Sequence, residues 1–526
     1  MLRYPITSSL EFAGEAQEQT ATARVRPPSR WKRYVVPVAS LTLLGCFAVL
    51  QLSRWPNRLR YPGEEDAAEG TQLSEMVHLR RGIQIYRGPS NGEFDSAIYG
   101  PLCYLLGAAV VNPQQPAYLP LRLLSLAATI GLATLSGIFV FRITGSKLGA
   151  ALAPILLLGN AYVARYGVSA RADMVALLLS FAGFFVFFSH RNSRRALMLA
   201  AGLMLLSFFY KQQFIGAPAS VFLYLLISKR FRAATEFAAA LGIGGVLLIA
   251  VFSALVFPGQ PFLTHFLAYN HLPFDKHLVM PEILMFVIPL FVPLLGSADF
   301  LDAQEDRLLK VYAVLATCGY FLLLLSSGSG ADTNRCLEAV VVLNCLMASR
   351  IASVRSVLSG IAWTAALLIT LGLVTLLDSA FVVPKVQDSD FQDDAVVQKY
   401  LRDNFAVDTP ILTYYASDPL RAGLAAPITN LWHYSALLRK GMIPDRDILA
   451  RIQRGGYGAI LLDFDLDASS IQKNGDFYTT PSVRAAIVAN YHEHAQLKQP
   501  LPEFTRFSTG TIHVWVPLPS KLGARN

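Results

Sequence analysis

Charged residues are scarce in this chain of 526 residues, in which Asp, Glu, Lys and Arg together make up only 15%. A soluble globular chain carries about 25% charged residues, so the composition argues against a protein that is soluble along its whole length. The deficit is uneven, because charge gathers in residues 1–33, 54–96 and 385–526 while long apolar runs fill the middle. This distribution is typical of a polytopic membrane protein joined to a water-soluble tail.

Cysteine is also rare, and the chain contains five. All of them precede the C-terminal soluble region, which therefore has no internal disulfide, and their spacing is not that of a metal site. The sequence shows no internal repeat, no low-complexity tract and no nucleic-acid motif. The five are Cys46, Cys103, Cys318, Cys336 and Cys345.

Long apolar runs predict about eleven transmembrane helices, since a span needs roughly 20 largely apolar residues. Helices are expected because a lipid-exposed backbone must satisfy its own hydrogen bonds. Two short neighbours, 196–210 and 213–228, alternatively form one re-entrant unit. The predicted spans centre on 34–53, 122–142, 148–165, 173–189, 196–210, 213–228, 236–257, 279–297, 310–327, 336–350 and 357–378.

Lys and Arg in the short loops predict the orientation of these spans. Alternate loops are rich in cations, as in Arg191, Arg194 and Arg195, whereas the loops between them hold mostly single cations. The N-terminus is therefore expected in the cytoplasm and the C-terminus outside it. The net charge of +9 suits cytoplasmic loops that face anionic lipid. No cleavable signal peptide is apparent, so the first span is expected to be an uncleaved anchor.

The chain divides into three predicted parts. Residues 1–33 are expected to form a disordered cytoplasmic tail, and residues 34–384 a transmembrane domain with a large outer loop, 54–121. Residues 385–526 are expected to form an extracytoplasmic α/β domain. Within the outer loop, apolar residues group on one side of a predicted helix at 69–82.

Alternating helix and strand signals support the α/β assignment of the tail. An amphipathic helix is predicted at 389–405 and a second helix, closed by glycine, at 445–456. Strands are predicted at 410–416 and 457–466. Before them, "AIYGPLCYLLGAAVV" (97–111) is too short for a span and is expected to be a helix in the outer headgroup layer.

Ionisable residues gather at the outer ends of several predicted spans. Ionisable groups at a membrane boundary are costly unless paired or hydrated, which favours a functional role. A solvated acidic loop, a salt bridge that ends a helix or snorkelling side chains would give the same pattern without chemistry. Together the cations and carboxylates are what an anionic headgroup and a hydroxyl nucleophile require. The residues are Asp66, Glu69, Arg171, Asp173, Lys211, Gln212, Asn334, Arg335 and Glu338.

Four motifs, in this order, resemble the GT-C glycosyltransferases, the polytopic enzymes related to protein mannosyltransferases and lipid A aminoarabinose transferases. "EG" at 69–70, with "IY" at 85–86 and "YGPLCYLL" after it, is similar to the family's first outer loop. "RAD" at 171–173 is similar to its second acidic loop, and "KQ" at 211–212 occurs in bacterial members. "TNRCLE" at 333–338 resembles an Asn-Tyr-x-x-Glu element. The likeness covers roughly residues 33–380, and the tail also looks like that of bacterial members.

The sequence departs from the family pattern at three points. Ala68 precedes Glu69 where the family usually has Asp, Gly100 follows Tyr99 where it usually has Pro, and Arg335 stands where it usually has Tyr. Glu69 is nevertheless the predicted catalytic carboxylate, with Asp66 as a substitute about one helical turn earlier.

The resemblance implies transfer of a sugar from a polyprenyl-phosphate carrier to a glycan, lipid or protein acceptor at the outer face, with inversion. Glu69 would accept the proton of the attacking hydroxyl, and Asp173 would orient the acceptor. Arg171, Lys211 and Arg335 would hold the lipid phosphate. Such donors generally need no cofactor, although the sequence is compatible with a divalent ion. Further substrate-binding residues would be Gln212, Asn334, Glu338, Tyr99 and His271.

Two other functions are compatible with parts of the sequence. A transporter or lipid-linked sugar flippase would show paired half-sequences or charge near mid-membrane. A non-catalytic envelope assembly protein would use its exposed tail to bind a partner. The resemblance of the tail to bacterial members favours a bacterial plasma membrane.

Overall fold

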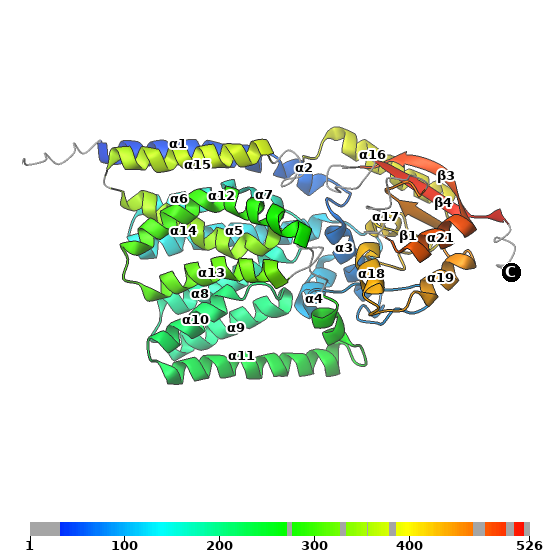
Figure 1. Ribbon diagram of the computed structural model, residues 1–526, viewed down its shortest axis with the longest axis horizontal. Coiled ribbons are helices and arrows are strands. Elements are labelled where there is room, and N and C mark those ends of the chain that lie inside the picture. Colours follow the sequence, from blue (N-terminus) through cyan, green and yellow to red (C-terminus); the bar gives the residue numbers. More distant parts are fainter. Residues whose placement is uncertain are drawn as a thin grey trace, which may run out of the picture.

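The computed structural model describes residues 32–270, 276–326, 333–354, 356–377, 385–466, 479–500 and 510–519. Within these ranges the chain is mostly helical. A bundle of long helices forms one end of the molecule and a small sheet flanked by helices forms the other (Figure 1).

The helices of the bundle coincide with the apolar segments predicted from the sequence. Helices α9 and α10 are separate and are joined by a turn at 211–215. The bundle comprises α1 (Lys32–Leu52), α5 (Leu119–Thr144), α6 (Lys147–Gly159), α8 (Asp173–Ser189), α9 (Arg194–Tyr210), α10 (Gly216–Ile227), α11 (Phe231–Val251), α12 (Lys276–Asp302), α13 (Arg307–Ser326), α14 (Leu337–Ser353) and α15 (Val357–Leu377).

By length and composition, four helical stretches among the described residues can cross a membrane. Several other apolar helices of the bundle are shorter than a full span, so the predicted number of eleven transmembrane helices is not confirmed. The four stretches are Val38–Arg60, Leu119–Thr144, Phe231–Val256 and Asn334–Ser353.

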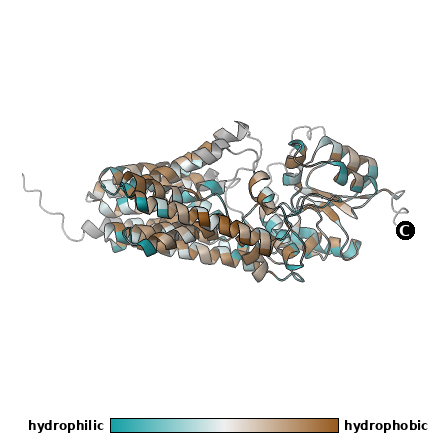
Figure 2. Cartoon of the chain, turned by 90° about the horizontal axis from the view of Figure 1, so that it is seen from below, coloured by the Kyte–Doolittle hydropathy of each residue, from teal (hydrophilic) through white to brown (hydrophobic). Residues whose placement is uncertain are grey.

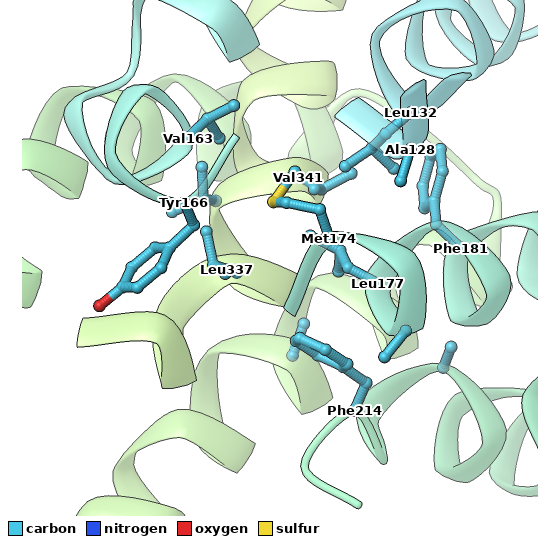
Figure 3. Packing of buried hydrophobic residues seen from close by; sticks show 14 of the residues in the cluster. Ala128, Leu132, Val163, Tyr166, Met174, Leu177, Phe181, Phe214, Leu337 and Val341 are labelled. Atoms are coloured by element: carbon cyan, nitrogen blue, oxygen red, sulfur yellow. The ribbon is translucent and has the colours of Figure 1, made fainter. Parts of the chain in front are cut away.

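Burial differs sharply between two of these stretches. Helix α14 is buried along most of its length, and Figure 3 shows Val341 of α14 packed with Met174 of α8 in the apolar core. Helix α11 instead exposes large apolar side chains, among them Ile243 and Val246. A large exposed apolar surface marks a membrane or protein contact. Apolar residues cover the bundle and polar residues gather at its ends and on the sheet region (Figure 2).

Short helices connect the bundle to the sheet region. The helix predicted at 69–82 is confirmed as α3, and α4 forms within the segment 97–111. The connecting elements are α2 (Trp55–Arg60), α3 (Ala67–Arg80), α4 (Pro101–Val110), α7 (Ala161–Tyr166), the π-helices η1 (Phe252–Val256) and η2 (Thr264–Ala268), and the 3₁₀ helix η3 (Thr333–Cys336).

The C-terminal region contains a four-stranded sheet in the order β1-β2-β4-β3. Strand β2 pairs in parallel with β1 and antiparallel with β4, which also pairs antiparallel with β3. The two helices and two strands predicted here are confirmed. The elements are α16 (Asp388–Asn404), β1 (Ile411–Thr413), α17 (Ser417–Arg421), α18 (Leu431–Arg439), α19 (Arg446–Gln453), β2 (Ala459–Leu462), α21 (Pro481–Asn490), β3 (Tyr491–Lys498) and β4 (Thr511–Pro517).

The loop between α3 and α4 packs into this C-terminal region. Phe94 forms a parallel bridge with Ile428, and its ring is buried in the same apolar cluster as residues of β1 and β2. The Ser96 amide donates to the Thr429 hydroxyl at 3.0 Å. The loop and the C-terminal region therefore share a core.

Candidate functional site

Arg122, near the start of α5, lies at the end of the bundle that adjoins the sheet region and holds several segments together there (Figure 1). Its side chain is completely buried, and its guanidinium donates to the carbonyl oxygens of Arg58 at 2.8 Å, Tyr61 at 2.5 Å and Gly63 at 2.8 Å. Arg122 Nη2 also lies 2.7 Å from Glu69 Oε2. A single buried cation thus holds the chain between α2 and α3 in place.

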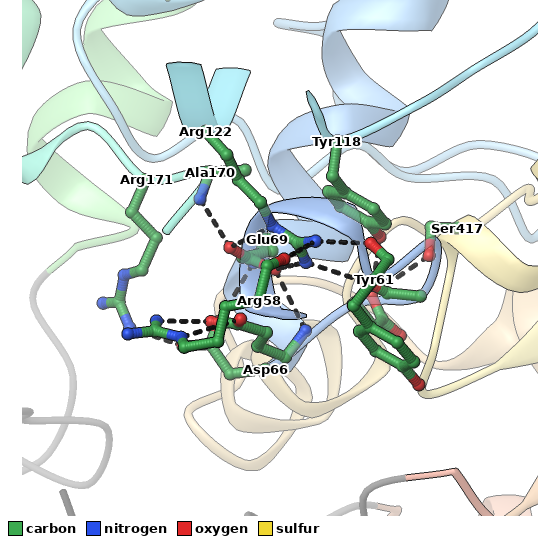
Figure 4. Close-up of polar contacts among 12 residues, drawn as sticks. Arg58, Tyr61, Asp66, Glu69, Tyr118, Arg122, Ala170, Arg171 and Ser417 are labelled. Atoms are coloured by element: carbon green, nitrogen blue, oxygen red, sulfur yellow. Dashed lines mark hydrogen bonds and ion pairs between the residues drawn. The ribbon is translucent and has the colours of Figure 1, made fainter. Parts of the chain in front are cut away.

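Glu69 lies in the first turn of α3 and is fully buried. Besides Arg122, its carboxylate accepts hydrogen bonds from the backbone amides of Glu65, at 3.0 Å, and Ala170, at 2.5 Å (Figure 4). Both oxygens are therefore engaged, and neither reaches solvent. Glu69 joins α3, α5 and the loop before α8.

Asp66 caps the N-terminus of α3, where an acceptor side chain satisfies an otherwise unpaired helix amide. Its Oδ1 accepts from the Glu69 amide at 3.0 Å, and its Oδ2 lies 2.9 Å from Arg171 Nη1. The Asp66 side chain is 20% exposed, whereas that of Glu69 is 0% exposed. Asp66 is therefore the more accessible of the two predicted carboxylates.

Asp66 and Arg171 begin a row of side chains whose charges alternate in sign. Arg171 Nε lies 3.4 Å from Asp173 Oδ2, and Asp173 Oδ1 lies 2.6 Å from Lys211 Nζ. Lys211 Nζ also lies 5.0 Å from the centroid of the Tyr99 ring, a distance typical of a cation–π contact. Burial raises the pKa of Tyr99, so its hydroxyl stays protonated at neutral pH. The row Asp66–Arg171–Asp173–Lys211 joins α3, α8 and the end of α9.

Four further predicted residues have other surroundings. The Gln212 amide donates to the carbonyl oxygens of Ile98 at 3.1 Å and Phe266 at 3.0 Å, so it fixes loops. Glu338 is buried and accepts from the backbone amides at the start of α10. The Asn334 carbonyl accepts from Gln213, and Arg335 follows Asn334 in η3. These residues adjoin the turn after Lys211. His271 lies outside the described residues.

Two buried arginines at this site, Arg58 and Arg122, were not predicted from the sequence as site residues. Arg58 binds the Glu65 carboxylate through two nitrogens, at 2.9 and 2.5 Å, and is fully buried. A usable signal was present for Arg122, because an ionisable residue at the edge of an apolar run of this length needs a buried partner. Among the residues with described positions, no group of three or more His, Cys, Asp or Glu is arranged to hold a metal ion.

No protein-family model matches the chain, and no curated protein matches it in sequence. Its fold is similar to that of ArnT from Cupriavidus metallidurans in the apo state, with a TM-score of 0.58 and 10% sequence identity over 91% of this chain and 98% of that one. The same protein bound to undecaprenyl phosphate gives a TM-score of 0.56 and 11% identity, over 89% and 97%.

The chain has the ArnT fold. The predicted resemblance is therefore confirmed at the level of the fold. The fold agrees with the apolar helices of the bundle, four stretches of which are long and apolar enough to cross a membrane.

Proposed function

We propose that the chain is a membrane glycosyltransferase that transfers a sugar from a polyprenyl-phosphate carrier to an acceptor hydroxyl, with inversion. The ArnT fold supports this proposal, because one of the similar ArnT structures is bound to undecaprenyl phosphate. The observation that carries it is the row Asp66–Arg171–Asp173–Lys211, in which two cations alternate with two carboxylates and Asp66 alone is partly exposed.

The proposed topology has eleven spans, with the N-terminus in the cytoplasm. The row of charges then lies at the extracytoplasmic end of the bundle, beneath the C-terminal region, in a bacterial plasma membrane. A lipid carrier presents its phosphate at the headgroup level, which is where this end of the bundle lies in the proposed topology.

In the proposed reaction the acceptor oxygen bonds to the anomeric carbon of the sugar, and the bond from that carbon to the phosphate oxygen breaks. The released polyprenyl phosphate keeps the electron pair, and its growing negative charge needs positive partners. Arg171 and Lys211 supply them, because Asp66 and Asp173 hold both cations in place before the reaction. Preorganised charges of this kind stabilise a transition state strongly.

Asp66 is better placed than Glu69 to accept the proton of the attacking hydroxyl. A general base must come within hydrogen-bond distance of that proton. Both oxygens of each carboxylate have a partner, but Glu69 is fully buried, whereas the Asp66 side chain is partly exposed and can be reached from solvent. Glu69, which the sequence predicts as the catalytic carboxylate, then acts as a positioning residue that fixes the first turn of α3.

The test is carrier-dependent sugar transfer by the purified chain, with Asp66→Asn compared with wild type. Loss of a general base is expected to lower the turnover about 10²–10⁴-fold. Glu236→Gln is the control, because Glu236 pairs with Arg194 and Arg232 in α9 and α11, away from the row of charges. Equal turnover in Asp66→Asn would remove Asp66 from this role. Carrier movement across vesicles without sugar transfer would favour a flippase instead.

A further inference from the structure

A small pocket with both polar and apolar walls lies beside Asp66, between the segment that precedes α3 and the C-terminal region. Its walls include Tyr61, Glu64 and Asp66 from that segment, and Tyr414, Tyr415 and Asp418 from the C-terminal region. The pocket volume is about 70 Å³, and a single water needs roughly 10–15 Å³. The space is therefore large enough for a few waters or for the edge of one small molecule.

Glu64 lines this pocket and carries a carboxyl oxygen without a hydrogen-bond partner among the described residues. Glu64 is 8% exposed as a whole residue. Its Oε2 accepts hydrogen bonds from the Tyr118 and Ser417 hydroxyls, each at 3.3 Å. Its Oε1 is buried and has no hydrogen-bond partner among the described residues. A buried polar atom without a partner is rare and costly in a folded protein. A ligand that donates a hydrogen bond would complete it.

Burial, with a contribution from nearby Asp418, raises the pKa of Glu64 well above its ordinary value. A protonated Glu64 both donates and accepts a hydrogen bond, which suits a hydroxyl group better than an ammonium group.

Two glycines hold the pocket in this shape. A Cβ atom at Gly70 would lie 1.4 Å from Glu64 Oε2, and one at Gly63 would lie 2.6 Å from the Tyr61 hydroxyl oxygen and 2.9 Å from Asp394 Oδ1. Side chains at these positions would displace the polar groups that line the pocket. The rings of Tyr414 and Tyr415 stand edge to face with centroids 5.0 Å apart, which adds an aromatic wall.

We propose that this pocket binds a sugar of the acceptor, so that the chain glycosylates a glycan hydroxyl. This inference rests on the proposed function, because the pocket shares Asp66 with the row of charges. Sugar rings combine several hydroxyls with apolar C–H faces, and they match a pocket that combines carboxyl groups with tyrosine rings. One hydroxyl of the sugar would form the missing hydrogen bond to Glu64 Oε1, and a neighbouring hydroxyl would reach Asp66.

The experiment measures sugar binding separately from carrier binding on the purified full chain. Probes are a fixed panel of methyl glycosides of common hexoses, pentoses and N-acetylhexosamines, titrated calorimetrically without donor, and undecaprenyl phosphate titrated in parallel. The variants are Glu64→Gln, which changes the buried carboxyl group, and Gly63→Ala, which narrows the pocket. Glu93→Gln is the matched control: Glu93 lies in the loop between α3 and α4, pairs with Arg87 and Arg451 and does not line the pocket.

The expected result is saturable binding of at least one glycoside, weakened about tenfold or more by Glu64→Gln and by Gly63→Ala, equivalent to about 1.4 kcal/mol or more. Undecaprenyl phosphate binding and the Glu93→Gln control are expected to match wild type. Four results would overturn the glycan-binding pocket: no glycoside binds, binding is equal in both pocket variants, carrier binding falls in parallel, or serine and threonine peptides are the acceptors. Retained carrier-dependent transfer would then keep the proposed function, whereas its absence in wild type would end that proposal as well.

Discussion

Glu69 and Asp66 belong to the same turn of α3, and burial gives them different chemistry. Glu69 is sealed by Arg122 and two backbone amides, whereas Asp66 keeps 20% of its side chain exposed. A carboxylate that must take and release a proton needs access to it, and a sealed ion pair serves mainly to hold elements together. The nearby Glu64 and Glu75 differ again, because each leaves one carboxyl oxygen without a hydrogen-bond partner among the described residues.

Glu69→Gln is expected to destabilise the fold as well as to reduce activity. The change leaves the buried Arg122 charge without its carboxylate partner, and breaking such a pair costs about 3–5 kcal/mol. Thermal unfolding of the purified protein in detergent measures the loss. Glu93→Gln, at a partly exposed pair, is expected to change stability by less than about 1 kcal/mol. An unchanged melting temperature together with lost activity would return Glu69 to a catalytic role.

Glu75 is expected to make stability depend on pH. Burial raises its pKa to about 8 from the ordinary value of 4.5. The folded protein therefore binds this proton more tightly than the unfolded chain between those values, and stability falls as pH rises through the window. Melting temperatures measured from pH 5.5 to 8.5 are expected to fall less steeply in Glu75→Gln than in wild type. Parallel curves for the two proteins would contradict this assignment.

Close backbone contact joins the short helices to the bundle. Helix α4 begins just after Gly100, whose amide donates to the Tyr210 carbonyl oxygen at 3.3 Å at the end of α9. A Cβ atom there would lie 1.8 Å from the Phe209 carbonyl oxygen. Gly100 therefore has a packing role in this chain: it lets α4 and Tyr99 approach Lys211.

Gly100→Ala is expected to separate α4 from α9, at a cost of about 1–3 kcal/mol typical of overpacking. The substitution should also move Tyr99 away from Lys211 and weaken undecaprenyl phosphate binding. Gly202→Ala on α9 is the matched control, because a Cβ atom there meets nothing within 4 Å. Thermal unfolding and carrier titration of both variants test the contact, and equal behaviour of the two would refute it.

The molecule as a whole separates its charges between two ends. The row of charges and the C-terminal region lie at one end of the bundle, and the loops rich in arginine, including that before α11, lie at the other (Figure 1). The shared core around Phe94 keeps the sheet region fixed above the row of charges. Orientation in the membrane therefore decides on which side the chemistry takes place.

Cysteine labelling of intact cells tests the orientation. Val407→Cys places a thiol on a position that is 78% exposed in the C-terminal region, and Arg232→Cys replaces a side chain that is 91% exposed at the other end. A membrane-impermeant maleimide is expected to label residue 407 in intact cells and residue 232 only after permeabilisation. The wild-type chain gives the background from its five native cysteines. The reverse pattern would place the proposed site in the cytoplasm.

The sequence by itself determined the features that depend on local pattern. Apolar runs placed the helices of the bundle, periodicity predicted α3, α16 and the strands β1 and β2, and boundary charges singled out Asp66, Arg171, Asp173 and Lys211. These signals are local because helix and strand periods, and the cost of charge near lipid, depend on each segment's own residues.

Only the tertiary structure decided which carboxylate is sealed, which keeps access to solvent, and where the small pocket lies. Arg122 meets Glu69 across 53 residues of chain, the Ala170 amide across 101, and Ser417 meets Glu64 across 353. Burial and hydrogen bonding of a side chain depend on neighbours brought together by folding. No local sequence pattern encodes this burial and hydrogen bonding. These two properties separate the proposed positioning role of Glu69 from the proposed chemistry of Asp66.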